Sequence, residues 1–349
     1  MKQIYIFTSI LFLTFININA QTSDFITNLS GPRGLILNGN YLYIAESNAG
    51  KISKVDITSS NPIAIEVVTG LNAPTEFVFS NNFLYFSQSN GGKISKINIS
   101  ATNPTVVDVI TGLNTPTGLA LNENDLYISE VSGGKVSKID ITSVNPTVSD
   151  VVTGLTSPYD IIINGNDLLI ADFNDNKISK IDITAANPTV TDVVTDLNIP
   201  TGLAIIGNDL YISEANGGKV SKINITSANP TLTDVVTGLS GNFGIERAGN
   251  SLYINEFSTG KIIKFTSSTL SVEDVLLANK KIAYPNPASN FIAISGLHTQ
   301  ENYTIYNTLG QEVKNGSVTN NAKIDIQNFN NGLYFLKFEK GNTLKFIKE

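Results

Sequence analysis

The chain has 349 residues, with no Cys, no Trp and one His. This length is enough for two domains, and the lack of cysteine excludes disulfides, thiol chemistry and thiolate-bound metals. The net charge of −7 is uneven: residues 1–278 hold 15 Lys+Arg and 25 Asp+Glu, a balance of −10, whereas residues 279–349 hold 8 and 5, a balance of +3. An acidic main portion argues against nucleic acid or an anionic membrane as its partner.

The first 20 residues have the pattern of a secretory signal peptide. Lys2 gives a positive start, residues 4–15 form an apolar run, and Ala20 precedes the expected cleavage point before Gln21. The apolar run is shorter than a membrane-spanning helix requires. We therefore expect residues 1–20 to be removed and no stable membrane span to remain. An uncleaved membrane anchor is the alternative.

Residues 23–29 (SDFITNL) form a predicted strand that precedes a series of repeats. Their sequence matches residues 149–155 (SDVVTGL), which are the fourth strand of a repeat. A lone fourth strand at the N-terminus can complete the last repeat and close a ring, which removes open sheet edges. Residues 272–276 (VEDVL) also resemble a fourth strand. We favour the N-terminal segment as the closing strand.

A repeat of 42 residues runs six times through the chain. Two sets of residues keep this spacing. They are Pro32, Pro74, Pro116, Pro158 and Pro200, with Asn242 in the sixth place, and Lys51, Lys93, Lys135, Lys177, Lys219 and Lys261. A fixed period of this length indicates a stack or ring of one supersecondary unit. Since six near-copies share their chemistry, a specific site is expected where one copy departs from the others.

Each copy holds four short apolar segments separated by turn residues. In the copy from Pro116 the segments are residues 117–121, 126–130, 135–141 and 148–155. Glycine at 133 and 134 suits a hairpin turn, because glycine readily adopts positive φ. Four short strands per 42 residues are typical of one blade of a β-propeller.

The recurrent sequences PTGLA (116–120 and 200–204) and LYISE (126–130 and 210–214) resemble six-bladed propellers of the NHL, YWTD and gluconolactonase-like group. The resemblance implies an all-β fold, a six-bladed β-propeller over residues 21–278. It is specific for the fold and weak for activity. An open solenoid is the alternative, but solenoid repeats are shorter or hold fewer strands.

An acidic residue recurs five positions before each repeated lysine. The set is Glu46, Glu130, Asp172, Glu214 and Glu256, with Gln88 in the second copy. One interpretation is a ring of carboxylates that binds cations. The favoured interpretation is a pair across each hairpin that braces every blade in the same way.

The two residues after each proline vary between copies, and in this fold they face the central channel. Copies three and five hold Thr-Gly there. The departures in the other copies are Arg33, Glu76, Tyr159, Asp160 and Phe243. One cation, two carboxylates and two aromatic rings suit a small polar or sugar-like ligand. We therefore expect a ligand site at one mouth of the channel. Sequence drift in copies that need no glycine is the alternative.

Catalytic metal ligands do not carry over from the gluconolactonase-like enzymes. The resemblance implies metal-binding Asn and Asp side chains directly after the proline. Those positions hold Arg33, Thr75, Thr117, Tyr159, Thr201 and Phe243. Glu76 and Asp160 lie one residue later and so point differently in a strand. We predict no cofactor and no metal ligand, with a divalent metal such as calcium left open.

The sequence changes character at about Asn279. YPNP (284–287), IYNTLGQ (305–311) and NNGLYFLKF (330–338) follow in order. Alternating residues and Asn/Gly turns predict a small β-sandwich over residues 279–349. The three motifs together resemble the C-terminal sorting domain of the type IX secretion system in Bacteroidetes. This resemblance implies that the type IX machinery is a partner and that the protein is secreted or held on the outer cell surface. An accessory ligand-binding sandwich is the alternative.

These observations favour a binding or interaction module over an enzyme, because the chain shows no catalytic set of residues. A glycan, a peptide or a small polar molecule is the expected ligand. A metal-dependent lactonase or hydrolase using Glu76 and Asp160 is one alternative, and a structural surface or adhesion component is another. Bound divalent metal would favour the enzyme, and metal-free binding of a ligand would favour the module.

Overall fold

The computed structural model describes residues 21–249, 251–266, 282–295, 297, 300–308, 310–319, 322–339 and 343–349. The predicted signal peptide, the candidate strand at 272–276 and the predicted domain junction at 278–279 lie outside these residues. The described chain forms two compact units, a propeller and a smaller pair of sheets. No helix in this part of the chain is long and apolar enough to cross a membrane.

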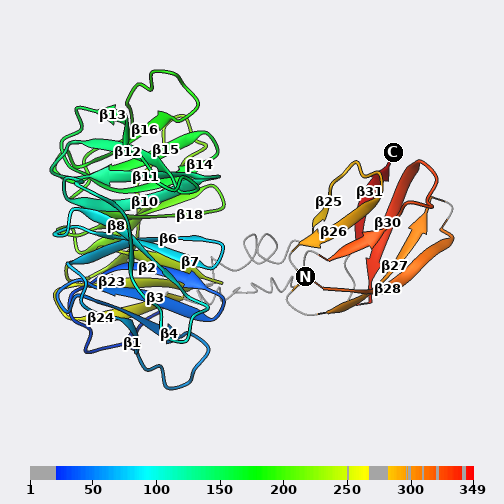
Figure 1. Cartoon of the computed structure of the whole chain (residues 1–349), viewed down its shortest axis with the longest axis horizontal. Helices are drawn as coiled ribbons and strands as arrows, with labels where there is room; N and C mark the ends of the chain where they lie inside the picture. Colours follow the sequence, from blue (N-terminus) through cyan, green and yellow to red (C-terminus); the bar gives the residue numbers. More distant parts are fainter. Residues whose placement is uncertain are drawn as a thin grey trace, which may run out of the picture. The chain divides into compact units, whose positions relative to one another are not determined.

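Six four-stranded sheets make up the first unit, as the 42-residue period predicts (Figure 1). The first strands of blades one to six are β2 (Pro32–Asn38), β6 (Pro74–Ser80), β10 (Pro116–Asn122), β14 (Pro158–Asn164), β18 (Pro200–Ile206) and β22 (Ile245–Ala248). The second strands are β3 (Tyr41–Glu46), β7 (Phe83–Gln88), β11 (Asp125–Glu130), β15 (Asp167–Asp172), β19 (Asp209–Glu214) and β23 (Ser251–Glu256). The third strands are β4 (Lys51–Asp56), β8 (Lys93–Asn98), β12 (Lys135–Asp140), β16 (Lys177–Asp182), β20 (Lys219–Asn224) and β24 (Lys261–Thr266). The fourth strands are β5 (Ile65–Val68), β9 (Val107–Thr111), β13 (Ser149–Thr153), β17 (Thr191–Val194), β21 (Thr233–Thr237) and, for blade six, β1 (Gln21–Ile26).

The N-terminal strand closes the ring, as predicted. β1 pairs antiparallel with β24, from Gln21 opposite Thr266 to Ile26 opposite Ile262. Its Asp24 pairs with Lys261 at 3.0 Å. In blade three the fourth strand supplies the same contact to its own lysine. β1 therefore takes the place that a fourth strand has in every other blade.

The blades are buried on both faces, which explains why their apolar residues do not alternate. Five consecutive residues of β11, Leu126 to Glu130, are all buried. Between blades two and three, Tyr85 and Ile94 pack against Leu119 and Ile128. First strands of neighbouring blades contact one another, which places them around the centre of the ring. The repeated sequence therefore produces a repeated core between adjacent blades.

The recurrent acid pairs with the lysine across the hairpin in blades one, three, five and six, as the favoured interpretation predicts. In blade three, Glu130 is 2% exposed and lies 3.6 Å from Lys135. Its carboxylate also accepts hydrogen bonds from the backbone N–H of Asn114 at 2.8 Å and from the hydroxyl of Ser137 at 2.7 Å. The equivalent acids bond the equivalent interblade loops through Ser30, Thr156, Asn198 and Ser240. Each acid thus ties a hairpin to the loop that enters its blade.

Replacing Glu130 by Ala should lower the free energy of unfolding by about 1–3 kcal/mol, because it leaves the buried hydroxyl of Ser137 and the partly buried N–H of Asn114 without their acceptor. Urea unfolding measures the loss. Glu130→Gln is the matched control, since Gln88 already performs this role in blade two with bonds to Asn72 and Ser95. Equal stability of the two variants would contradict the brace.

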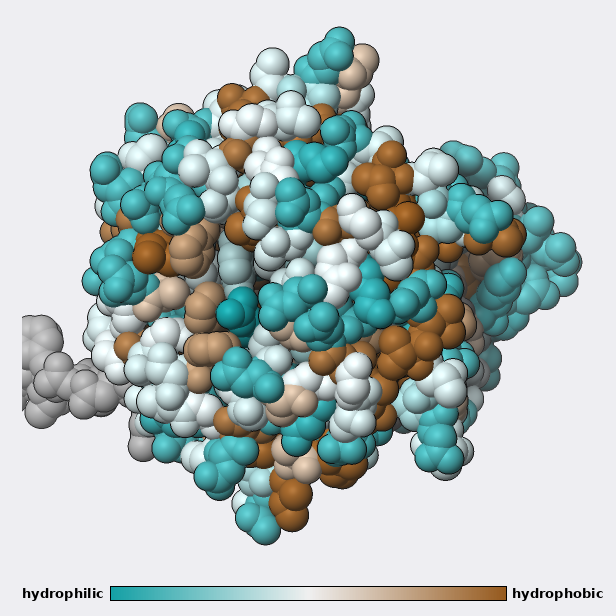
Figure 2. Space-filling model, turned by 60° about the vertical axis from the view of Figure 1, so that its left-hand side comes forward, coloured by the Kyte–Doolittle hydropathy of each residue, from teal (hydrophilic) through white to brown (hydrophobic). Residues whose placement is uncertain are grey.

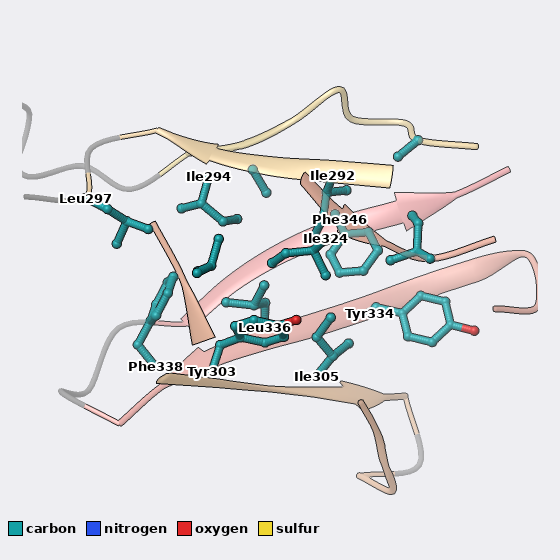
Figure 3. Packing of buried hydrophobic residues seen from close by; sticks show 14 residues of the cluster. Ile292, Ile294, Leu297, Tyr303, Ile305, Ile324, Tyr334, Leu336, Phe338 and Phe346 are labelled. Atoms are coloured by element: carbon teal, nitrogen blue, oxygen red, sulfur yellow. The ribbon is translucent and has the colours of Figure 1, made fainter. Parts of the chain in front are cut away.

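The second unit consists of two small antiparallel sheets. One contains β25 (Ile282–Tyr284), β26 (Phe291–Ser295) and β29 (Lys323–Asp325), and the other contains β28 (Glu312–Val318), β27 (Glu301–Asn307), β30 (Gly332–Phe338) and β31 (Thr343–Lys348). Figure 3 shows apolar side chains of both sheets pointing into the space between them. Ile292, Ile305, Leu336, Phe338 and Phe346 are fully buried there. The two sheets thus share one core, as expected for a small β-sandwich.

Candidate functional site

Backbone crowding at the channel explains where copies keep glycine. A Cβ atom on Gly118 would lie 2.7 Å from the carbonyl oxygen of Tyr159 in the next blade, and one on Gly202 would meet the backbone of Phe243. The Thr-Gly pairs of blades three and five therefore allow the next first strand to approach closely. Blades two and four carry Glu76 and Asp160 at this position instead.

Arg33 lies at the centre of the predicted site and connects three blades. Its Nη1 donates a hydrogen bond to the hydroxyl of Tyr159 at 3.0 Å, although the two residues are 126 positions apart. Its guanidinium carbon lies 5.1 Å from the centre of the Phe243 ring and 5.0 Å from that of Phe257, distances typical of cation–π contacts. Three of the five predicted residues, Arg33, Tyr159 and Phe243, therefore come together as one cluster.

Two hairpin residues that sequence reasoning missed extend this cluster. Phe173 stacks on Tyr159 at 5.7 Å, and Phe257 meets Phe243 edge to face at 5.4 Å. Tyr159 and Phe243 also contact each other at 5.7 Å. Phe173 and Phe257 begin the hairpin between the second and third strands, where the other copies have Ser, Ala or Val. The same comparison between copies, applied to the hairpins, would have found both.

Asn255 holds the cluster in position and was also missed. It is fully buried, and its side chain accepts a hydrogen bond from the backbone N–H of Phe243 and donates one to the carbonyl of Arg33. In blade three, Ser129 plays the corresponding part by donating to the carbonyl of Tyr159 at 2.7 Å. Second-strand side chains thus fix the backbone of the residues that face the channel.

Two carboxyl groups, Glu76 and Asp160, line the channel cavity, and a third, Glu246, lies close enough to Glu76 to affect its pKa. Asp160 is 7% exposed and accepts hydrogen bonds from the backbone N–H groups of Ile161 and Leu203, both at 2.8 Å. Burial raises its pKa to about 7. Burial also raises the pKa of Glu246 to about 8 and, with repulsion from Asp160 and Glu246, raises the pKa of Glu76 well above its usual value. Glu246 was missed because it lies four residues after Asn242, where the other copies are apolar.

The propeller should become less stable as the pH rises from about 5 to about 9. In the unfolded chain Asp and Glu release their protons near pH 4, whereas folded Asp160 and Glu246 hold theirs to about 7 and 8. The stability that these two groups contribute is therefore fully present below pH 4 and is lost progressively until the folded pKa values are passed. Thermal unfolding across this range checks the slope, and the double variant Asp160→Asn with Glu246→Gln should flatten it. A wild-type profile as flat as that of the double variant would contradict the raised pKa values.

Two cavities meet at Arg33 and Tyr159. The larger, of about 620 Å³, is here called the face pocket and is within the usual size of a ligand site. Its wall consists of the turns at 47–50 and 89–90, the loop at 71–73, Thr115, Thr117 and Val131, with Arg33 and Tyr159. The smaller, the channel cavity, is only about 10 Å³, hardly enough for one water molecule.

The two cavities divide the predicted site residues into two groups. Arg33 and Tyr159 line both cavities, whereas Glu76, Asp160 and Phe243 line only the channel cavity. A ligand in the face pocket would therefore touch the first pair directly and lie above the other three. Hydrophilic and hydrophobic side chains are interspersed in small groups on the propeller surface that Figure 2 displays.

The described residues contain no set of side chains arranged to bind a metal ion. Within them, no three His, Cys, Asp or Glu side chains are close enough to hold one ion. The hairpin at 172–176 carries acidic and amide oxygens, but both carboxylate oxygens of Asp172 accept hydrogen bonds from the backbone of Thr156 and Ser157. Asp172 therefore acts as the brace of blade four.

Comparisons with known proteins address the two units separately. Residues 282–349 match the family described as the secretion system C-terminal sorting domain. No curated protein sequence matches the chain.

Solved structures share the propeller fold at low sequence identity. Virginiamycin B lyase from Staphylococcus aureus is 16% identical, with a TM-score of 0.52 over 71% of this chain and 99% of that one. A chain of the nidogen/laminin complex is 17% identical, with a TM-score of 0.58 over 67% and 91%. An auxiliary nutrient binding protein from Bacteroides ovatus is 11% identical, with a TM-score of 0.60 over 70% and 76%.

These identities establish the fold and leave the activity open. The sorting-domain match indicates secretion or attachment to the outer cell surface and implies contact with the secretion machinery. The chain therefore joins a six-bladed β-propeller to a C-terminal segment, residues 282–349, that matches the secretion system C-terminal sorting domain.

Proposed function

We propose that the propeller is a secreted binding module whose ligand occupies the face pocket. The observation that carries this proposal is the convergence of residues in which the copies depart from one another. Arg33 of blade one and Tyr159 of blade four meet at 3.0 Å on the floor of a cavity of ligand size. Two residues that differ from their counterparts in the other blades thus lie side by side where a ligand can reach them.

The second candidate function is a hydrolase, and the raised pKa values favour it. Groups with strongly shifted pKa values often serve as catalytic acids or bases, and the pKa of Asp160 is about 7. Asp160 and Glu76, however, line the narrow channel cavity below Arg33 and Tyr159. A substrate in the face pocket would meet the arginine and the phenol first, so binding is the simpler function for this geometry.

The fold itself agrees with either function. Its structural neighbours include a lyase and a nutrient binding protein. The choice between binding module and hydrolase therefore depends on the residues of this chain. The binding proposal includes glycans and peptides as ligand classes.

Thermal unfolding with a panel of ligands tests the proposal. The secreted protein is melted alone and with a chelator, calcium, neutral and acidic sugars, lactones and short peptides. A ligand at 100 times its dissociation constant adds about 2.7 kcal/mol to stability, which raises the Tm by several degrees. We expect one ligand class to raise the Tm without any effect of the chelator.

The matched variant carries Arg33→Thr and Tyr159→Thr, the residue that blades three and five hold naturally at this position. It should lose the ligand-induced rise while keeping a normal Tm alone. A chelator that lowers the wild-type Tm would support the hydrolase instead. A panel without any effect would leave a structural surface component as the better account.

A further inference from the structure

The guanidinium of Arg33 is a cation without an acidic partner in the described part of the chain. Its hydrogen-bond acceptor there is the neutral hydroxyl of Tyr159, and the rings of Phe243 and Phe257 lie beside it. Its Nε–H is buried and has no acceptor among the described residues. A guanidinium has five N–H donors and binds planar carboxylates through pairs of them. Arg33 is therefore short of both acceptors and negative charge.

The carboxyl groups nearby do not neutralise this charge at neutral pH. The titratable groups that line the channel cavity besides Arg33 are Glu76 on β6 and Tyr159 and Asp160 on β14. β10 and β18 contribute threonine and glycine there. Glu246 on β22 interacts with Glu76 from outside that lining. Because burial raises the pKa of each of the three carboxyl groups, they retain protons where ordinary carboxyls have lost them. Below about pH 7 these carboxyl groups therefore leave the charge of Arg33, in the wall of the face pocket, largely unneutralised.

The wall of the face pocket offers hydrogen-bonding groups that are not already used. The side-chain amides of Asn48, Asn72 and Asn90 line it, and each is exposed. No described side chain or backbone group bonds these amides. On blades four and five, by contrast, the corresponding amides bond the neighbouring loop. Those bonds are Asn174 to Ser157 at 2.7 Å and Asn216 to Asn198 at 3.0 Å.

We propose that the face pocket binds acidic saccharides, with the sugar carboxylate on Arg33 and the sugar hydroxyls on the amides of Asn48, Asn72 and Asn90. This proposal rests on the proposed binding function and names its ligand class. An amide both donates and accepts, as a sugar hydroxyl does. The carboxylate supplies the acceptors and the charge that Arg33 lacks.

Isothermal titration of the secreted protein tests the proposal at pH 6. The probes are galacturonate, glucuronate and their short oligomers. Their controls are galactose, glucose and the neutral oligomers of the same length, together with N-acetylated amino acids, which carry a carboxylate without a sugar. We expect the acidic sugars to bind at least about tenfold more tightly than the neutral sugars, since one charged contact discriminates at this level.

Three variants separate the parts of the pocket. Arg33→Thr should lower affinity for the acidic sugars to that of the neutral ones, and Arg33→Lys should restore part of it by keeping the charge without the planar fork. Asn90→Ala should weaken the oligomers and leave the Tm unchanged. The Tm of each variant without ligand shows that it is folded.

The pH dependence provides an independent readout. Between pH 6 and 9 the ligand carboxylate stays ionised, while Asp160 and Glu246, whose pKa values are about 7 and about 8, lose their protons and add negative charge near the channel. Affinity for galacturonate should therefore fall as the pH rises, and Asp160→Asn with Glu246→Gln should reduce that fall.

Two results would overturn the acidic ligand class. Neutral sugars that bind as tightly as acidic ones would remove the role of the carboxylate, although the binding function would stand. N-acetylated amino acids that bind as tightly as uronates would show that the pocket recognises a chain-end carboxylate and no sugar. If none of the probes binds while another ligand raises the Tm in the broader panel, the saccharide proposal fails and the binding function stands. If nothing binds, both fail.

Discussion

Deletion of residues 21–26 should lower the free energy of unfolding of the propeller by about 5 kcal/mol or more, the combined effect of one buried and one half-buried apolar side chain and a lost ladder of hydrogen bonds. β1 is the fourth strand of blade six and pairs with β24 along its length. Ile26 is 8% exposed, and Phe25 meets the buried Tyr253 edge to face at 4.8 Å. Urea unfolding measures the loss of stability. Light scattering should also rise, because the deletion exposes β24 as an open sheet edge.

A rearranged variant is the matched control for this deletion. Residues 21–26 are moved to follow Thr266 through a copy of the loop at 141–148, which joins the third and fourth strands of blade three. The moved strand then has the same antiparallel partner as before. It should recover most of the lost stability. A deletion variant as stable as the wild type would show that β1 does not close the ring.

Removal of residues 282–349 should abolish export in a host that carries the type IX secretion system. These residues match the sorting domain, which the secretion machinery recognises. The truncated protein should accumulate inside the cell, while the wild type appears in the medium or on the surface. Fractionation and immunoblotting measure the distribution. Normal export of the truncated protein would contradict the role of this domain.

Two adjacent residues allow a finer test of the sorting domain. Phe346 is fully buried in the core between the two sheets and stacks on Tyr334 at 5.5 Å, whereas Ile347 is 44% exposed. Phe346→Asp should disrupt the domain and reduce export strongly. Ile347→Asp adds the same charge on the surface and should export nearly as the wild type does. Equal export of the two variants would mean that the secretion machinery does not recognise the folded sandwich.

Most of the fold could be predicted from the sequence because the repeat has a constant length. A period of 42 residues with four apolar segments fixes the number of strands per blade and the number of blades. The match between residues 23–29 and 149–155 predicted the closing strand, and β1 occupies that place. The acid that recurs before each lysine predicted the hairpin brace, which Glu130 and Lys135 form.

The candidate site could be predicted only in part, because its contacts join residues far apart in the sequence. Departures from the repeat identified Arg33 and Tyr159, but no local pattern shows that they meet across the channel. Nor does the sequence show that the space beneath them is too small for a ligand. The division of the five predicted residues between two cavities depends on side-chain packing.

Glu246 illustrates a second limit of the sequence comparison. At its position in the repeat the other copies hold Ile, Val or Ala, so Glu246 differs from the repeat as clearly as Glu76 does. The comparison stopped two residues after the proline, because the fold places those residues at the channel. Glu246 interacts with Glu76 although its place in the repeat is two residues later than that of Glu76. A comparison over the whole repeat would have included it.

The central claim is that the ligand binds where the copies differ, and one measurement tests it most directly. Calorimetric titration compares the wild type with a variant in which the site carries the Thr-Gly of blades three and five: Arg33→Thr, Glu76→Gly, Tyr159→Thr, Asp160→Gly and Phe243→Thr. The ligand that raises the Tm of the wild type should show no detectable binding to this variant, while the variant still unfolds cooperatively. Undiminished binding to the folded variant would place the site elsewhere and contradict the account.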